Sequence, residues 1–191
     1  MINKKVINYL QKQKVSFDVL DHKTVFTAYD LAQTLKEDLK KIAKTLLIKA
    51  DKDYIVVILP AHYRLDLKKL KKVLKAQKVE IPKEKLMIKV LKIKTGGLTP
   101  FGNLHQLETW VDKSLLKTQK MIMNAGSFNQ SLRMKVKDFI KMEEAKLGSF
   151  VEAGGYKLQV KPKKSKKQKS KKVKTKKVNK PKSKKTKKNK K

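Results

Sequence analysis

The strongest constraint on the fold is a pair of apolar runs in the first third of the chain. Residues 54–59 read YIVVIL, so a strand here is apolar on both faces and lies inside a sheet rather than at its edge. Residues 45–48 form a second strand-like run, and Asp51, Lys52 and Asp53 between the two runs are typical of a turn. The sequence therefore predicts a β-hairpin whose second strand is central in a sheet.

Helices and further strands interleave around this hairpin without a regular repeat. Apolar residues at helical spacing, together with capping residues such as Thr27 and Asp66, predict helices over residues 3–13, 28–35, 67–74, 83–91 and 136–142. Alternating or apolar runs predict strands over residues 15–20, 109–111, 121–123 and 132–134. This pattern predicts an α+β domain in which a mixed β-sheet is flanked by helices.

The end of the chain has a composition that cannot form a hydrophobic core. From Lys161 to Lys191 there are 19 lysines and no acidic residue, and the only aliphatic side chains are Val173 and Val178. Such a segment buries too little apolar area to offset the entropy lost on folding. The sequence therefore predicts two parts: a folded domain over residues 1–155 and a lysine-rich, low-complexity, disordered tail over residues 156–191.

The charge of the chain indicates a polyanionic partner. The formal net charge is +35, and residues 1–160 carry 32 Lys and Arg against all 16 Asp and Glu, so they alone have a net charge of +16. RNA, DNA or an anionic membrane surface fits such a charge. The N-terminus lacks the apolar segment of a signal peptide, no stretch approaches the roughly 18 apolar residues of a membrane span, and there is no cysteine. These features predict a soluble, cytoplasmic protein without a membrane partner.

Several common types of enzyme site are missing from the sequence. His22, His62 and His105 are 40 and 43 residues apart and have no acidic residue at ligand spacing, which argues against a zinc site. There is no Gly-x-Ser-x-Gly nucleophile motif, no nucleotide P-loop and no dinucleotide-binding glycine pattern. We therefore expect no metal and no cofactor, and we interpret His22 as a structural hydrogen-bonding residue.

Two features remain as candidates for a functional site. One is a glycine-rich loop over residues 96–102, whose backbone N–H groups can approach a ligand closely. The other is Lys44, which stands at the head of a predicted buried strand, an unusual place for an ammonium group. Each also has a simpler interpretation: the loop as a tight turn, and Lys44 as a strand-edge lysine that reaches solvent.

Six motifs occur in an order and spacing that are specific when taken together. They are Phe26-Thr27-Ala28 at a helix start, Ala43-Lys44-Thr45-Leu46-Leu47, Leu65-Asp66-Leu67-Lys68-Lys69-Leu70, Gly96-Gly97-Leu98-Thr99-Pro100-Phe101-Gly102, Val111-Asp112 and Asn124-Ala125-Gly126-Ser127. Over about residues 1–152 the chain resembles the YbaK/ProX family of aminoacyl-tRNA editing domains, which is related to the editing insertion of bacterial prolyl-tRNA synthetases.

The resemblance implies hydrolysis, in trans and without a metal, of the ester that joins a wrong amino acid to tRNA. Lys44 matches the characteristic active-site lysine and is the expected catalytic residue. The attacking water is organised in this family largely by the substrate's own ribose hydroxyl, which fits the lack of a Ser-His-Asp or Cys-His set here. The implied substrate-binding residues are Phe26, Thr27 and Ala28 around the amino acid, Gly96, Gly97, Leu98, Thr99 and Pro100 at the 3′-terminal adenosine, and Asn124, Gly126 and Ser127.

The chain also departs from the family pattern. Some members have Ser-Gly-Gly and an acidic residue where this chain has Asn124-Ala125-Gly126 and Ser131. Because these positions bear on the pocket, the edited amino acid stays open, and alanine or cysteine on tRNA for proline is the expectation from the family. The tail has no counterpart in the family, and we expect it to raise affinity for tRNA without sequence preference.

Two other functions fit the same sequence. The chain is alternatively a non-catalytic RNA- or DNA-binding protein that uses the editing fold and the basic tail as a platform. A third interpretation is a partner domain that binds an aminoacyl-tRNA synthetase.

Overall fold

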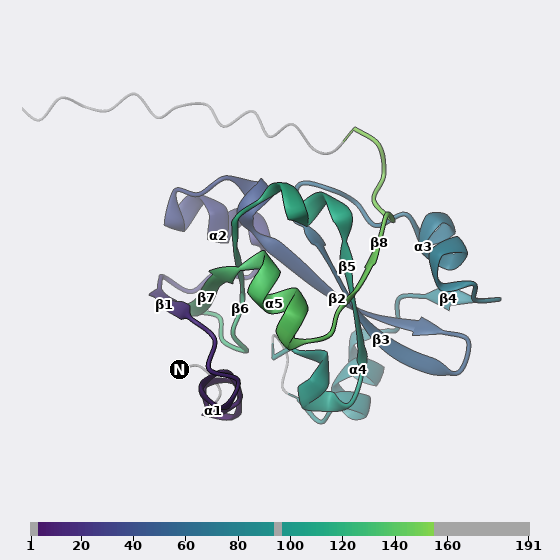
Figure 1. Ribbon diagram of the computed structural model, residues 1–191, viewed down its shortest axis with the longest axis horizontal. Coiled ribbons are helices and arrows are strands. Elements are labelled where there is room, and N and C mark those ends of the chain that lie inside the picture. Colours follow the sequence, from purple (N-terminus) through teal and green to yellow (C-terminus); the bar gives the residue numbers. More distant parts are fainter. Residues whose placement is uncertain (1–3, 94–96, 155–191) are drawn as a thin grey trace, which may run out of the picture. The chain divides into compact units, whose positions relative to one another are not determined.

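The computed structural model describes residues 4–93 and 97–154 (Figure 1). Gly96 and the predicted tail over residues 156–191 therefore lie outside the described residues. The helices are α1 (Lys4–Lys12), α2 (Ala28–Leu35), α3 (Leu67–Leu74), α4 (Glu84–Leu91) and α5 (Val136–Met142), with 3₁₀ helices η1 (Leu39–Lys41), η2 (Gly102–His105) and η3 (Lys113–Lys117). The strands are β1 (Phe17–Asp21), β2 (Ala43–Ala50), β3 (Asp53–Pro60), β4 (Val79–Glu80), β5 (Glu108–Asp112), β6 (Lys120–Asn124), β7 (Gln130–Lys135) and β8 (Lys146–Gly148).

The strands form two sheets that meet at one point. The larger sheet has the order β4-β2-β3-β5-β8 and is mixed, because β2 pairs antiparallel with β3 and β4 whereas β3, β5 and β8 run parallel. The smaller sheet is antiparallel, with the order β1-β7-β6. A parallel bridge between Ile42 and Ile122 joins the residue before β2 to β6, so the sheets meet where β2 begins.

Strand β3 separates two hydrophobic cores. Val56 and Ile58 belong to the first core, which α1, α5 and the smaller sheet also enclose. Ile55, Val57 and Leu59 point to the opposite face and pack in the second core, under α3. Since side chains alternate along a strand, a strand between two cores needs apolar residues at every position. This requirement accounts for the uninterrupted apolar run that predicted the central strand.

Helix α2 covers the junction between the two sheets. Leu31 and Ala32 on its inner face pack against Ile42 and Ile122, the two residues of the bridge. The residue before β2 thereby packs between α2 and the middle of β6. This junction is where the candidate site lies.

The predicted α+β class with a mixed sheet and flanking helices is confirmed, with the strands divided between two sheets. The strand predicted over residues 15–20 corresponds to β1, which begins two residues later, at Phe17. Val19, expected on the half-buried face, is 43% exposed, because β1 packs through Phe17 on one core and Leu20 on another. Strands β4 and β8 were missed, since two or three residues are too short to show a period. None of the helices in the described part of the chain has the length and apolar character needed to cross a bilayer.

Candidate functional site

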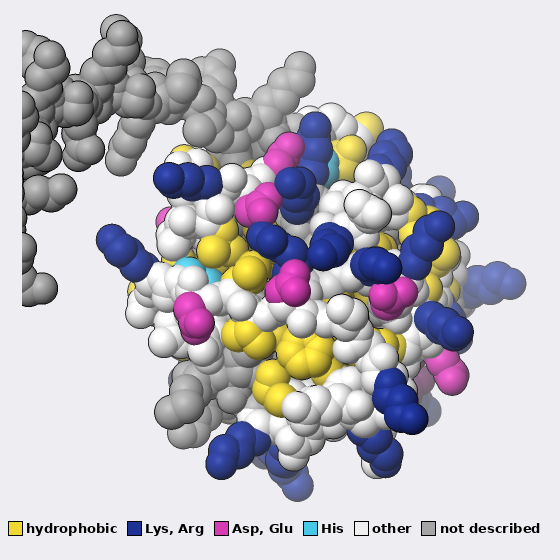
Figure 2. Space-filling model, turned by 60° about the vertical axis from the view of Figure 1, so that its left-hand side comes forward, with side chains coloured by type: hydrophobic (Ala, Val, Ile, Leu, Met, Phe, Trp, Pro, Cys, Tyr) yellow, Lys and Arg dark blue, Asp and Glu magenta, His cyan; other side chains and the backbone are white. Residues whose placement is uncertain are grey.

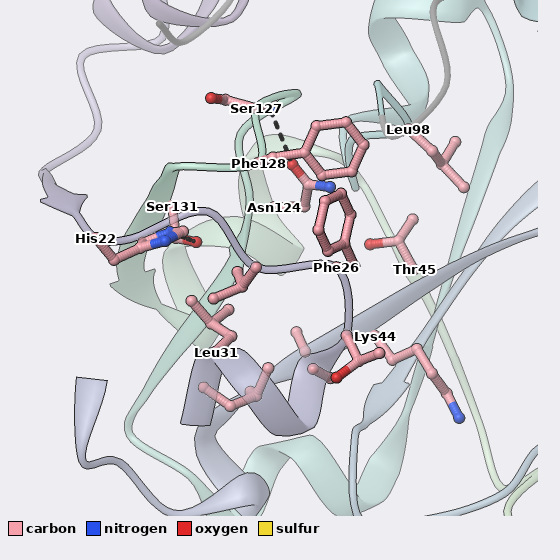
Figure 3. A pocket seen from close by; sticks show the side chains of 15 residues that line it. His22, Phe26, Leu31, Lys44, Thr45, Leu98, Asn124, Ser127, Phe128 and Ser131 are labelled. Atoms are coloured by element: carbon pink, nitrogen blue, oxygen red, sulfur yellow. Dashed lines mark hydrogen bonds between the residues drawn. The ribbon is translucent and has the colours of Figure 1, made fainter. Parts of the chain in front are cut away.

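A cavity of about 250 Å³ opens at the sheet junction (Figure 3). Its walls come from the connection between β1 and α2, the start of α2, the start of β2, the end of β6 with the turn that follows it, β7, and the glycine-rich loop before η2. Segments that lie far apart in the sequence therefore meet around one space. Seven of the predicted site residues line it, namely Phe26, Thr27, Ala28, Lys44, Leu98, Asn124 and Ser127.

The start of α2 is fixed by a capping interaction. Thr27 is the N-cap, in an extended conformation, and its hydroxyl accepts a hydrogen bond from the Asp30 backbone N–H at 3.1 Å while donating to the Asp30 carboxylate at 2.7 Å. This reciprocal pair sets where the helix begins and so where Phe26 stands. Phe26 is 76% exposed, and its ring lies 5.1 Å from that of Phe128 at a tilt of 52°. The two rings form an exposed aromatic pair that also lines the cavity.

Lys44 is half-buried and does not simply extend into solvent. Its Nζ donates a hydrogen bond to the backbone carbonyl oxygen of Tyr63 at 3.1 Å. Burial lowers the pKa of the Lys44 ammonium, and the nearby positive charge of Arg64 lowers it further. Figure 3 shows the side chain leaving β2 at the cavity edge, with its ammonium directed away from Phe26 and Asn124. The reactive end of Lys44 thus lies at the border of the cavity rather than at its centre.

Thr45, the next residue of β2, also lines the cavity. Its hydroxyl oxygen is buried and has no hydrogen-bond partner among the described residues. A buried hydroxyl without a partner is unfavourable unless something else satisfies it. Thr45 therefore presents an unused hydrogen-bonding group to whatever enters the cavity.

The turn after β6 is held by the side chain of Asn124. Its Oδ1 accepts hydrogen bonds from the backbone N–H of Gly126 at 2.6 Å and of Ser127 at 3.2 Å. Gly126 has φ of 78°, in the left-handed region that glycine adopts without strain. The predicted site residues in this turn thus have different places: Asn124 and Ser127 line the cavity, and Gly126 shapes the turn that carries them.

One end of the cavity is closed by His22 and Ser131, which lie together in Figure 3. His22 Nδ1 is 2.8 Å from the Lys23 carbonyl oxygen, and Nε2 is 2.9 Å from Ser131 Oγ. A carbonyl oxygen only accepts, so Nδ1 carries the proton and, in the neutral ring, Nε2 accepts from the serine hydroxyl. The Ser131 side chain is buried at 2% exposure. His22 thus makes hydrogen bonds through both ring nitrogens, which agrees with its interpretation as a structural hydrogen-bonding residue.

The glycine-rich loop contributes less to the wall than its sequence suggests. Leu98 lines the cavity, whereas Gly97 does not, and Thr99 and Pro100 are buried without lining it. The next residue, Phe101, is fully buried in the first core. The loop is therefore anchored by its second half and contributes Leu98 to the wall of the cavity.

A buried carboxylate holds the far end of this loop. Glu143 is 3% exposed, and its carboxylate accepts hydrogen bonds from the Asn103 backbone N–H at 3.0 Å and the Tyr9 hydroxyl at 2.7 Å. Burial raises the pKa of Glu143, and these hydrogen bonds partly oppose the increase. Burial and the bond to Glu143 also raise the pKa of Tyr9 to about 12. Glu143 thereby ties α1 to η2, directly after the loop.

Few of the side chains around the cavity are ionisable. Lys44 and His22 are the titratable side chains in the described lining, which contains no carboxylate. In the same described part of the chain, no three His, Asp or Glu side chains are grouped closely enough to hold a metal ion. The arrangement can bind a small group between aromatic and aliphatic walls, with one ammonium at its border.

Comparison with known proteins connects this geometry to a family. The aminoacyl-tRNA editing domain matches the chain over residues 22–142, a span that contains all the cavity-lining residues. The chain belongs to the aminoacyl-tRNA editing domain family. The resemblance to YbaK/ProX proteins drawn from the six motifs is thereby confirmed.

Individual relatives of this editing domain support the assignment. "Prolyl-tRNA editing protein ProX" of Acetoanaerobium sticklandii is 23% identical over 151 residues, or 76% of this chain and 92% of that protein. The proline–tRNA ligase of Macrococcus caseolyticus is 27% identical over 102 residues, which are 53% of this chain but 18% of the ligase. A solved structure of a candidate trans-editing enzyme for prolyl tRNA synthetase shares the fold, with a TM-score of 0.70 at 19% identity over 78% of this chain and 96% of that one.

Sequence reasoning left some of the lining of this editing domain unassigned. Thr45, Phe128 and His22 line the cavity but were not predicted as site residues, and Ser131, which also lines it, was connected with the pocket only through its departure from the family pattern. Two of them had a usable signal, because Thr45 follows Lys44 directly and Phe128 follows the Asn124–Ser127 turn. His22 and Ser131 come together only through the pairing of β1 with β7, in which Leu20 is opposite Ser131.

Proposed function

We propose that this protein is a trans-editing deacylase that hydrolyses the ester bond of a mischarged tRNA. The observation that carries the proposal is the cavity in an editing-domain chain where Lys44 meets the start of α2, Leu98 and the turn after β6. These are the segments that the family resemblance assigns to the active site. The proposed substrate is a small noncognate amino acid, alanine or cysteine, on tRNA for proline: the names of the relatives support tRNA for proline, and the amino acid follows from the family resemblance.

The shape of the cavity suggests how the substrate lies in it. The closed end near His22 and Ser131, with aliphatic walls from Val25 and Leu31, takes the amino-acid side chain. The opposite border, where Lys44 and Leu98 lie, takes the ester and the terminal adenosine. A volume of about 250 Å³ has to hold the acyl group and part of the ribose, and this limit favours a small amino acid.

The chemistry proposed for Lys44 is electrostatic. Ester hydrolysis develops negative charge on the carbonyl oxygen, and a positioned donor in a partly buried site stabilises that charge. Burial leaves the Lys44 ammonium less hydrated than that of an exposed lysine, and this loss of hydration is also what lowers the pKa of Lys44. In the proposed mechanism the Lys44 Nζ moves from the Tyr63 carbonyl to the substrate, and the ribose hydroxyl of the substrate organises the attacking water. No metal takes part in this proposal.

The test is deacylation of a panel of mischarged tRNAs by the purified protein in the presence of EDTA. We expect selective hydrolysis of one amino acid–tRNA pair, and a loss of roughly 100-fold or more in kcat for Lys44→Ala, as for removal of an oxyanion donor. Lys52→Ala is the matched control, because Lys52 is an exposed lysine in the turn at the far end of the same hairpin. Activity that vanishes with EDTA would contradict the metal-free mechanism.

The same experiment separates the alternatives left open by the sequence. Equal activity of the wild-type and Lys44→Ala proteins would refute the assignment of Lys44. No hydrolysis of any pair, combined with tight RNA binding, would identify a nucleic-acid-binding protein that uses the editing fold. Co-purification with a synthetase would test the proposed association with that partner.

A further inference from the structure

Basic side chains are too widely spread to show by themselves where a tRNA binds. Figure 2 shows Lys and Arg side chains over the whole visible face, not gathered in one patch. Charge therefore favours a polyanionic partner but does not show which surface the partner binds. We look for that surface beside the cavity, at the segment around Tyr63, because the Lys44 ammonium donates a hydrogen bond to the Tyr63 carbonyl oxygen.

The segment His62-Tyr63-Arg64, called here the 62–64 segment, is held firmly beside the start of β2. On one side, Ala61 N–H donates to the Ile42 carbonyl at 2.8 Å and Tyr63 N–H donates to the Pro60 carbonyl at 3.0 Å. On the other side, Glu152 N–H donates to the Arg64 carbonyl at 3.0 Å. These backbone bonds fix the position of the segment beside the start of β2.

The segment carries two rings in contact. The His62 and Tyr63 ring centroids are 3.9 Å apart with a tilt of 40°. Both residues are partly exposed, and His62 Nδ1 is buried without a hydrogen-bond partner among the described residues. Burial lowers the pKa of His62, and the charge of Lys40 lowers it further, which favours the neutral ring near pH 7. A neutral ring pair of this kind is a surface on which an unpaired base can stack.

Positive charges accompany these rings. Arg64 is exposed and close enough to Lys44 to affect its pKa, and Lys40 acts in the same way on His62. Aromatic rings beside cations, along a line that leaves a cavity, are the arrangement by which proteins bind single-stranded nucleic acid.

We propose that the 62–64 segment binds the unpaired nucleotides that precede the terminal adenosine of the tRNA. This inference rests on the proposed function, which places that adenosine in the cavity. Arg64 and Lys44 contact backbone phosphates, and the His62–Tyr63 rings stack with a base. The segment therefore holds the RNA strand and takes no part in hydrolysis of the ester.

The test compares two substrates with the same amino acid: the mischarged tRNA and the aminoacyl ester of adenosine alone. For Arg64→Ala we expect KM for the tRNA to rise roughly tenfold, and the slope of log KM against log salt to fall by about 0.7 for one lost phosphate contact. Hydrolysis of the adenosine ester should be unchanged. Arg64→Lys should restore most of the salt slope, and Lys52→Ala, which removes one charge elsewhere, should change neither substrate.

A second variant tests the rings. Tyr63 packs partly against the second core, so Tyr63→Leu keeps the apolar bulk and removes the aromatic face. We expect a rise of roughly fivefold or more in KM for the tRNA, since stacking on one ring contributes that much to binding. Equal losses on both substrates, or no loss on the tRNA, would overturn the proposal.

A binding measurement keeps this inference separate from the proposed function. If the wild-type protein hydrolyses neither substrate, the proposed function fails, and binding of uncharged tRNA is compared with binding of tRNA whose unpaired 3′ end has been removed. Weaker binding of Arg64→Ala to the intact tRNA alone would support the 62–64 segment as an RNA site. Identical affinities of wild-type and variant for the intact tRNA would refute it.

Discussion

The cavity and the 62–64 segment are neighbours with opposite physical character. The cavity is small and, apart from Lys44 at its border, is lined mainly by aliphatic, aromatic and hydroxyl side chains; its shape is set by buried contacts at the sheet junction. The 62–64 segment is partly exposed, cationic and aromatic, and it is held mainly through its backbone. Under the proposed function, changes in the cavity should alter kcat and the choice of amino acid, whereas changes along the segment should alter KM and its salt dependence.

Lys44 connects the two regions. It lines the cavity through its position on β2, and its ammonium reaches the backbone of the 62–64 segment. A lysine at this border can meet the ester from one side and a phosphate from the other. Its variants should therefore change both kcat and KM, unlike variants in either region alone.

Among changes on the cavity side, we expect the largest effect from Gly102→Ala. A Cβ at Gly102 would lie 2.5 Å from the Leu107 carbonyl oxygen and even closer to the Thr109 hydroxyl. The chain has to shift to accommodate it, at a cost of about 1–3 kcal/mol. Because the shift displaces the loop that carries Leu98, we expect kcat to fall at least roughly tenfold, with KM for tRNA less affected.

Gly148→Ala is the control for that experiment. A Cβ there meets side-chain atoms of Val73 on α3 and of Phe150 in the second core, neither of which belongs to the glycine-rich loop. Thermal unfolding of both variants should show lower Tm values. Kinetics below the transition should show a large loss of kcat for Gly102→Ala only, and equal kinetic losses in the two variants would remove the special role given to the loop.

The next effect concerns charge outside the cavity. Removing residues 161–191 deletes 19 lysines and no acidic residue. We expect KM for tRNA to rise roughly tenfold near physiological salt, with a shallower salt dependence and nearly unchanged kcat. Deacylation rates measured over a salt series would check this. Unchanged KM and salt slope would show that the tail has no part in tRNA binding.

A smaller effect is expected for Thr45→Val, which tests whether the cavity uses the Thr45 hydroxyl. Thr45→Val replaces a buried hydroxyl that has no partner among the described residues by a methyl group of similar size. The free energy of unfolding should rise by about 1 kcal/mol, because an unsatisfied polar group is removed. If the hydroxyl instead serves the substrate, kcat/KM should fall severalfold in the same, more stable protein. Chemical denaturation gives the free energy of unfolding, and kinetics on the same preparation give kcat/KM. A stabilised variant with full activity would show that the Thr45 hydroxyl does not bind the substrate.

The sequence predicted the secondary structure better than it predicted the walls of the site. Strand β3 could be predicted because a strand between two cores leaves a continuous apolar run, and α2 could be predicted because Thr27 is a strong N-cap. The division into two sheets could not, since it depends on the Ile42–Ile122 bridge between residues 80 positions apart. No local pattern records such a contact.

The family motifs named Lys44, Phe26 and Asn124, and all three line the cavity. Motifs do not show, however, which way a side chain points. Thr99 and Pro100 belong to the conspicuous loop and are buried without lining the cavity. Ser131 stands in an ordinary strand and closes one end of it. Orientation of this kind follows from strand register and core packing, which form only when the chain folds.

The smallest effect concerns Glu143, which supports the glycine-rich loop from inside the core. Because burial raises its pKa in the folded protein, the protonated form is favoured there relative to the unfolded chain. Its contribution to stability is therefore fully present below the ordinary glutamate pKa and is lost as the pH rises through the higher folded value. In Glu143→Gln this titration is absent. The amide oxygen can accept the hydrogen bond from the Asn103 N–H, while the amide NH2, in place of the second carboxylate oxygen, can donate to the Tyr9 hydroxyl.

The Tm of the wild-type protein minus that of Glu143→Gln should thus fall as the pH increases from 4 towards neutrality. Glu144→Gln, at the exposed neighbouring position, should show no such trend relative to wild type. If the Glu143 difference were instead constant or rose with pH, the carboxylate would be stabilised by its hydrogen bonds more than it is penalised by burial. The loop before η2 would then be held by a charged acceptor at neutral pH, and Glu143→Gln should loosen it and lower kcat, as Gly102→Ala does.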